Sequence, residues 1–180
     1  MNNINNRYKR IKYTWYNIIM SSVNEYRLKT QWAFYIHLQN DDDWSYSSYH
    51  KIMDINFAEE AILLNEEIPF DLIKKTMLFI MKTGIKPMWE DEQNQDGGGF
   101  SFKVHNKNIE YVWKKLFFLL IGQSLSLSTN DDINGISLSP KKSFCIIKIW
   151  MKNCKTINPS IFKDIEYMDK NGCIFKKHCS

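Results

Sequence analysis

The chain has 180 residues, of which 44% are hydrophobic, and this suits one globular domain or one domain with a tail. A formal net charge of +4 is a mild bias towards anionic partners, well short of the basic stripe of a duplex-DNA binder. No stretch reaches the roughly 20 apolar residues of a membrane span, so we expect no membrane partner. The four cysteines form no CxxC pair, which indicates a reduced, cytosolic or nuclear setting.

The first part of the chain differs in composition from the rest. Residues 1–28 are polar and then basic and aromatic, and we expect a variable N-terminal arm before a domain over residues 29–180. From residue 30 to 38 an aromatic, β-prone run predicts a buried strand. An acidic loop ending near Trp44 follows, and residues 47–55 predict a second strand.

A helix and a third strand are expected next. Residues 56–67 predict a helix in which Asn56 is the N-cap and Glu59 occupies the capping-box position. Pro69 marks a break, and the apolar run at residues 74–84 predicts a strand. A long polar loop with three glycines separates this strand from the next one.

The middle of the chain contains the clearest helix. After a short strand at 100–104, apolar residues recur at helical spacing through residues 106–122, with Gly122 where a C-cap belongs. Because Trp113 lies on the apolar stripe of this helix, we expect it in the core.

The last third predicts a hairpin, a helix and a strand. Residues 136–151 form the hairpin, and a lysine-bearing turn joins its strands. Asn, Pro and Gly at helix-boundary positions predict a helix over 158–172, and a strand follows at 173–177. These elements predict an α+β fold, with one antiparallel sheet covered on one face by about three helices.

Two of the six tryptophans lie in polar loops. Trp44 follows three aspartates, and Trp89 precedes the acidic run of residues 90–92. Two loop tryptophans on one rim can sandwich a flat ring, and stacking contributes about 1–3 kcal/mol per base. The alternative is that each indole caps the edge of the core, and spacing alone slightly favours that interpretation.

Carboxylates and lysines add candidate binding groups. Glu90 beside a stacking indole can accept two hydrogen bonds from a guanine edge. Glu90 and Glu92 could instead flank a glycosidic bond, or the run could be a solvated acidic turn. Lys141 and Lys142 suit a short phosphate chain or a solvated hairpin tip.

Neither a metal nor a nucleophilic centre is predicted. Cys173, His178 and Cys179 cluster near the C-terminus, but no second ligand pair accompanies them at zinc-like spacing, so we interpret them as free groups. The glycines at 97–99 lack the following GK[ST] of a P-loop and more simply permit a tight turn. We therefore expect no cofactor.

Together the segments "GIKPMWEDEQN", "WKKLFFLLIGQS" and the early "QWAFY…W" pattern resemble the eukaryotic translation initiation factor 4E family, which binds the mRNA 5′ cap. The resemblance runs from about residue 28 to 150. It implies a curved antiparallel sheet with three helices on the convex face and the cap on the concave face. It also implies a cytoplasmic, non-enzymatic protein whose partner is capped mRNA and which takes part in translation initiation.

The resemblance assigns roles to particular side chains. Trp44 and Trp89 would sandwich 7-methylguanine, whose positive charge attracts indoles. Glu90 would accept hydrogen bonds from N1–H and the exocyclic amine, while the Trp89 backbone N–H would bind O6. Trp150 would contact the methyl group, and Lys141, with Lys142, would bind the phosphates.

The sequence also departs from the family pattern. Gly99 and Ile146 stand at two family basic positions, so we expect weaker phosphate binding. On the convex face, Ala61 stands where the family has the tryptophan that docks the scaffold factor 4G and repressor proteins. Phe57 and Phe118 fall at neighbouring positions. The alternative function is therefore a cap-binding repressor or competitor that recruits no scaffold.

Overall fold

The computed structural model describes residues 25–69, 73 and 75–178, so residues 1–24 of the expected arm lie outside the described part. Its strands form one antiparallel sheet in the order β2-β1-β3-β5-β6-β4-β7. The strands are β1 (Arg27–Leu38), β2 (His50–Phe57), β3 (Thr76–Lys82), β4 (Gly98–His105), β5 (Ile133–Pro140), β6 (Phe144–Met151) and β7 (Ile174–Lys177). The α+β class with a single antiparallel sheet is thus confirmed.

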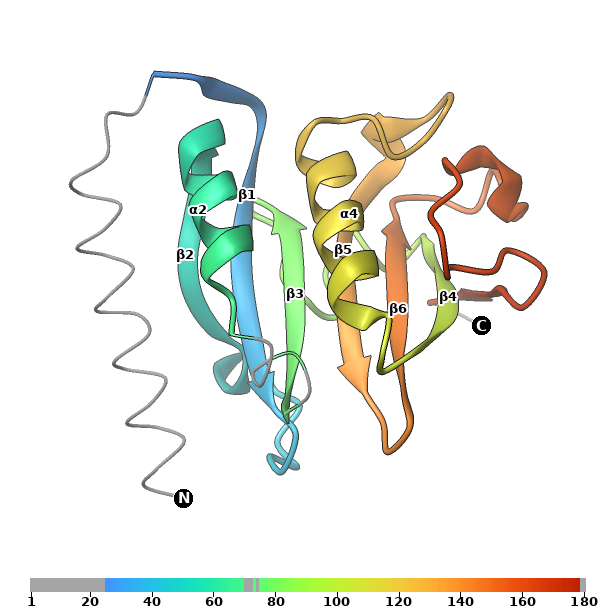
Figure 1. Cartoon of the computed structure of the whole chain (residues 1–180), viewed down its shortest axis with the longest axis horizontal. Helices are drawn as coiled ribbons and strands as arrows, with labels where there is room; N and C mark the ends of the chain where they lie inside the picture. The colour runs from blue at the N-terminus through green and yellow to red at the C-terminus, as the bar shows by residue number, and fades with distance from the viewer. Residues whose placement is uncertain (1–24, 70–72, 74, 179–180) are drawn as a thin grey trace.

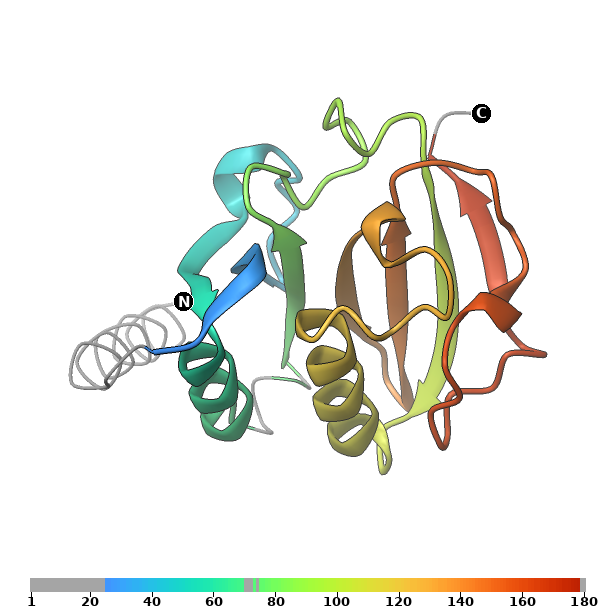
Figure 2. The same cartoon turned by 90° about the horizontal axis from the view of Figure 1, so that it is seen from above.

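Helices cover only one face of this sheet. The α-helices whose bounds lie within the described residues are α2 (Ala58–Glu67) and α4 (Ile109–Ile121), which correspond to two of the about three helices expected. Short 3-10 turns form η1 (Tyr46–Ser48), η2 (Asn130–Asp132) and η3 (Pro159–Ile161). Both α-helices pack on the same side (Figures 1 and 2). No helix in the described part combines the length and the apolar character required to cross a membrane.

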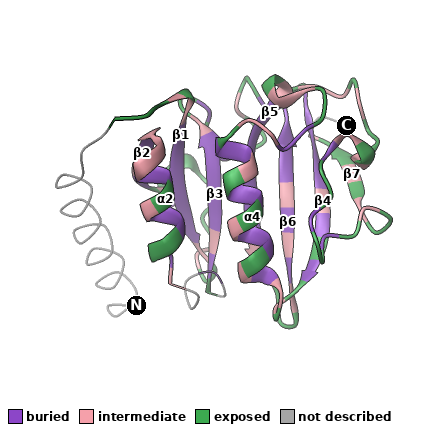
Figure 3. Cartoon of the chain, turned by 45° about the horizontal axis from the view of Figure 1, so that its top comes forward, coloured by how far each residue is buried: buried purple, intermediate pink, exposed green. Residues whose placement is uncertain are grey.

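The main core lies between the sheet and these helices. Alternate strand residues, such as Phe34 of β1 and Phe102 of β4, point towards the helices and are almost completely buried. The apolar stripe of α4 meets them, and Trp113 is 0% exposed, as the sequence predicts. The buried side of each helix and its exposed outer side are visible in Figure 3.

The start of α2 differs from the prediction by one residue. Phe57 is the N-cap, and the side chain of Glu60 completes the cap by accepting hydrogen bonds from the Asn56 and Phe57 backbone N–H groups at 2.6 and 3.1 Å. Glu59 instead accepts bonds from the backbone of residues 25 and 26. The prediction that Asn56 caps the helix with Glu59 is wrong because the neighbouring glutamate reaches the free N–H groups.

The helix predicted over 158–172 is also wrong. Asn158 does accept a hydrogen bond from the Ser160 N–H at 2.9 Å, but only the three residues of η3 follow. The next backbone groups bond across to another segment: the Lys163 N–H donates to the Leu125 carbonyl, and the Leu127 N–H donates to the Ile161 carbonyl. These long-range bonds use the groups that a continuing helix would need.

Packing on α4 generates a stability prediction. Leu116 is 0% exposed, whereas its neighbour Lys115 points to solvent on the same helix. Leu116→Ala should lower the free energy of unfolding by about 2–5 kcal/mol because it leaves a cavity. Lys115→Ala should change it by no more than about 0.5 kcal/mol. Urea denaturation followed by circular dichroism measures both, and equal effects would contradict the placement of the helix.

Candidate functional site

The face of the sheet opposite the helices carries a smaller apolar layer. Because strand residues alternate, a second cluster forms there from β1, β3 and β6 together with Ile85. Tyr49 and Met77 pack against its edge. The cluster consists of Ala33, Tyr35, Phe79, Met81, Ile85 and Trp150. It forms an aromatic floor on the face over which the 39–49 and 83–97 loops project (Figure 2).

Trp44 is held at one edge of this face. The residue is 53% exposed, and its ring stacks on the buried His37 of β1, with centroids 4.4 Å apart and planes 7° from parallel. His37 Nε2 is in turn 2.9 Å from the Asp43 carbonyl, to which it donates. One face of the indole is therefore covered by an imidazole, and the exposed part of the ring remains available to a ligand.

The acidic run before Trp44 has a structural role. Asp41 accepts a hydrogen bond from the Asp43 N–H at 3.0 Å, and the Asp43 carboxylate accepts from the backbone and hydroxyl of Ser45. These hydrogen bonds to Ser45 lower the pKa of Asp43. Such side-chain-to-backbone turns fix the loop on both sides of the indole.

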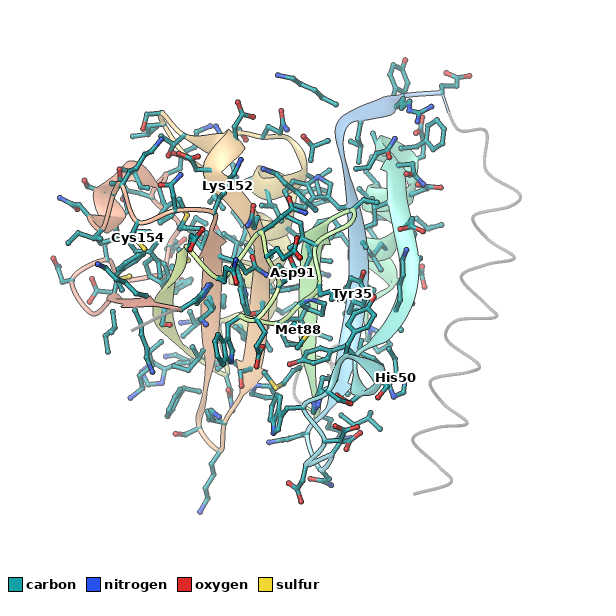
Figure 4. The ribbon with its side chains drawn as sticks, turned by 180° about the vertical axis from the view of Figure 1, so that it is seen from behind. Tyr35, His50, Met88, Asp91, Lys152 and Cys154 are labelled. Carbon is teal, nitrogen blue, oxygen red and sulfur yellow. The ribbon has the colours of Figure 1, made fainter. Side chains whose placement is uncertain are left out.

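Trp89 lies on the second loop and is 50% exposed. Asp91 fixes the loop by accepting hydrogen bonds from the backbone N–H groups of Lys86 and Gln93 at 3.1 and 3.0 Å. The buried Asn94 donates to the carbonyls of Lys86 and Met88. Figure 4 shows Met88 and Asp91 over the middle of the face opposite the helices, near Tyr35. Trp89 and the exposed Glu90 therefore lie on a loop that its own side-chain hydrogen bonds hold in place.

Contacts link this loop to the segment after Trp44. The Lys86 ammonium lies 5.2 Å from the centroid of the Tyr46 ring. Burial, and secondly the charge of Glu90, raise the pKa of Tyr49 to about 12. The Tyr49 ring lies 5.1 Å from the His37 ring, on which Trp44 stacks. The loop that carries Trp89 and Glu90 therefore faces the segment that carries Trp44.

Trp150 lies in the floor rather than on the rim. It is 5% exposed, and its Nε1–H donates to the Ser137 hydroxyl at 2.9 Å. The Lys148 ammonium is 4.3 Å from its ring centroid, and the His178 ring is 5.0 Å away. Alternation along β6 could have indicated Lys148, which is two residues from Trp150, but the sequence prediction missed it. It also missed His37 and Tyr49, and it interpreted His178 only as a free group.

The predicted phosphate lysines lie at the far end of the hairpin. Lys141 and Lys142 are exposed at the tip between β5 and β6, and the Lys141 N–H donates to the Phe144 carbonyl. Phe144 is six residues from Trp150 along β6, which corresponds to about 20 Å. The structure therefore does not bring either lysine next to Trp150.

The C-terminal segment attaches to the Trp89 loop. His178 donates from Nδ1 to the Asn94 carbonyl at 2.7 Å, and its backbone N–H donates to the Gly97 carbonyl.

Cys179 lies outside the described residues, and no group of three or more possible metal ligands occurs in the described part. Burial raises the pKa of the Cys173 thiol to about 11.

The convex face has its own exposed apolar side chains. Phe118 of α4 is 44% exposed and Ile62 of α2 is 47% exposed. Phe57 is half-buried at the start of α2, whereas Ala61 is 2% exposed and belongs to the core. Phe118 and Ile62 are therefore among the exposed apolar side chains on this side, whereas Ala61 contributes almost no side-chain area to its surface.

Solved structures with this arrangement define the class of fold. The chain is similar to Ascaris suum eIF4E-3 in complex with an m7G cap, with a TM-score of 0.67 and 21% identity over 77% of this chain and 79% of that chain. It is also similar to Caenorhabditis elegans eIF4E-3 in complex with the 4E-binding protein Mextli and a cap analog, with a TM-score of 0.70 and 17% identity over 85% and 92% of the two chains. The chain thus has the α+β fold of these proteins.

Sequence comparison identifies the family. The model for "Eukaryotic initiation factor 4E" matches residues 27–179, so the chain belongs to the eukaryotic initiation factor 4E family. The Candida albicans factor is 30% identical over 114 residues, which are 58% of this chain and 54% of that protein. The Candida glabrata factor is 25% identical over 76% of this chain and 69% of that protein. The chain therefore spans about half the length of the first of these relatives.

The attachment of His178 predicts a pH effect on stability. Burial lowers the pKa of His178 from the ordinary value of 6.5, more than its bond to Asn94 raises it, and the Lys148 charge lowers it further. Nε2 is buried without a partner among the described residues, so protonation there is unfavourable. Because the pKa of His178 is lower in the folded state than in the unfolded state, neutral His178 contributes stability to the fold above about pH 6.5. This contribution is lost as the pH falls through the pKa of the folded state.

We therefore expect His178→Gln to lose less stability than the parent between neutral pH and about pH 5. The matched control is His105→Gln, the same substitution at a histidine that is exposed on β4, and it tests whether the effect is specific to position 178. Urea unfolding at both pH values measures the difference. An unchanged pH dependence in His178→Gln would contradict the proposed burial of neutral His178.

Proposed function

We propose that the chain binds the 7-methylguanosine 5′ cap of mRNA and takes part in translation initiation by recruiting mRNA in the cytoplasm. The observation that carries the proposal is the placement of Trp44 and Trp89. Both are about half exposed, and both lie on hydrogen-bonded loops that face each other over the non-helical side of the sheet. Membership of the family and the cap named in the Ascaris suum complexes support it.

The chemistry of the base fits these groups. A 7-methylguanine ring carries a delocalised positive charge, so indoles attract it by stacking and by cation–π interaction. The exposed Glu90 carboxylate can accept hydrogen bonds from N1–H and the exocyclic amine. The Trp89 backbone N–H has no acceptor within the described residues and is available to O6. Trp150 would contact the ring from the floor, and Lys141 and Lys142 could contact only a distant part of the ligand.

A catalytic role has less support. Glu90 and Glu92 are both exposed, whereas the general acid of a glycosidase needs an environment that keeps it protonated. No group of metal ligands occurs in the described part. We therefore propose a binding protein that is not an enzyme.

A cap-retention experiment tests the proposal. The chain should bind immobilised 7-methyl-GTP and be released by free 7-methyl-GTP, but not by GTP at the same concentration. Glu90→Ala should weaken binding by about 1.5–3 kcal/mol because it removes charge-assisted hydrogen bonds. Tryptophan fluorescence quenching gives the affinity.

The matched control is Glu92→Ala, an exposed acidic neighbour that should leave the affinity within about twofold of the parent. Asp91 is unsuitable as a control because it fixes the loop. Equal release by GTP and 7-methyl-GTP would refute recognition of a charged purine. An unaltered affinity of Glu90→Ala would remove Glu90 from the site.

The convex face supports a second part of the proposal. Phe118 and Ile62 are exposed on α4 and α2, and such side chains can dock the apolar face of a helical motif. Mextli is the 4E-binding protein in the Caenorhabditis elegans complexes. We propose a partner of this kind, a 4G-type scaffold or a helical-motif repressor. Because Ala61 adds no anchor of its own, a cap-binding competitor without scaffold recruitment is the alternative function.

Co-purification with a scaffold fragment separates these functions. The parent should retain the fragment, and Phe118→Asp should reduce its retention by at least tenfold, because a charge replaces an exposed aromatic anchor. Ile174→Asp is the control, since Ile174 is 69% exposed on β7, away from both helices. Retention on 7-methyl-GTP without any scaffold binding by the parent would favour the competitor.

A further inference from the structure

Gly99 leaves a space that the side chain of Lys148 fills. Gly99 lies in β4, paired with Trp150 of β6 on one side and with Lys176 of β7 on the other. A Cβ atom at Gly99 would lie 2.8–2.9 Å from Cγ, Cδ and Cε of Lys148. Any residue larger than glycine would therefore displace this lysine, and Gly99 determines the path of its stem.

The far end of Lys148 is fixed over Trp150. Its ammonium lies 4.3 Å from the centroid of the indole, a distance at which cation–π attraction is effective. The indole is itself held by its hydrogen bond to Ser137. The ammonium of Lys148 thus lies on the same face of the sheet as the aromatic floor. The Trp44 and Trp89 loops project over this face.

A second cation lies beside the first. Lys176 is exposed, and strand pairing places it next to Gly99 on the side away from Trp150. Burial lowers the pKa of Lys148, and the charge of Lys176 lowers it further. In the described part of the chain, no carboxylate forms an ion pair with either ammonium. Two neighbouring cations that repel each other and lack an acidic partner favour an anion between them.

We infer that Lys148, whose stem lies over Gly99, and Lys176, which pairs with Gly99, bind the phosphate chain of the capped nucleotide. The inference rests on the proposed function, since the phosphates belong to the ligand whose base stacks near Trp44 and Trp89. Lysine suits this role as a point charge that needs no fixed hydrogen-bond geometry. The cationic side chain comes from β6 and occupies the space above Gly99, where the family resemblance would place a basic side chain from β4.

Ligands with and without phosphates separate this role from base binding. The affinities of 7-methylguanosine and 7-methyl-GTP are measured by fluorescence quenching for the parent and for Lys148→Met, which keeps an apolar stem over Gly99. We expect the variant to bind 7-methyl-GTP at least tenfold more weakly, with the affinity for 7-methylguanosine within about twofold of the parent. The dependence of 7-methyl-GTP affinity on salt should also become less steep.

Two further variants make the test specific. Gly99→Ala keeps every charge but moves Lys148, so it should weaken 7-methyl-GTP binding without weakening 7-methylguanosine binding. Lys115→Ala removes one positive charge from α4 on the opposite side of the sheet and should affect neither ligand. Thermal unfolding of each variant confirms that its fold is intact.

The outcomes distinguish this inference from the proposed function. If the parent binds neither ligand, the proposed function fails, and the inference fails with it. If the parent binds both ligands and Lys148→Met binds 7-methyl-GTP as the parent does, only the inference is overturned. An equal loss of both ligands in Lys148→Met would also overturn it, because the lysine would then act by supporting Trp150.

Discussion

The whole arrangement depends on a single sheet whose two faces meet different surroundings. Alternate residues such as Phe34 and Ile147 face the helices and form the main core. Their neighbours face the other way, where no α-helix of the described residues covers them. Because the helix side supplies most of the buried apolar area, the opposite face can carry partly exposed rings and charges. The candidate site lies on that face, beside the smaller of the two buried clusters.

Polar side chains, together with the buried Ile85 of the second loop, hold the two tryptophan loops in place. Asp43 and Asp91 accept backbone hydrogen bonds within their own loops, and Asn94 joins its loop to β5 through Asn134 and to the C-terminal segment through His178. A loop fixed in this way stays ordered even though its indole is half exposed. When a flat ligand stacks on either tryptophan, binding therefore loses little conformational entropy of the loop.

Local patterns predicted the parts of the fold that local interactions determine. The strand at residues 30–38 follows from its β-prone composition, and the helix around Trp113 follows from helical periodicity. The helix expected over 158–172 failed because its backbone groups bond to residues 125–127, which no local pattern indicates. Trp44 and Trp89 stood out by their polar surroundings. His37 could not be identified as the partner of Trp44, because that contact depends on how the loop folds back over β1.

Strand pairing also explains how a side chain from one strand can place its charge over a residue of the neighbouring strand. Neighbouring strands place the side chains of one face about 5 Å apart, so a long side chain from β6 can occupy the space above a residue of β4. Gly99 permits this, and the stem of Lys148 takes the space. Position 99 itself carries no cation, but the ammonium of Lys148 from the adjacent strand lies on the same face. The absence of a charged residue at one position therefore does not imply the absence of charge from that part of the surface.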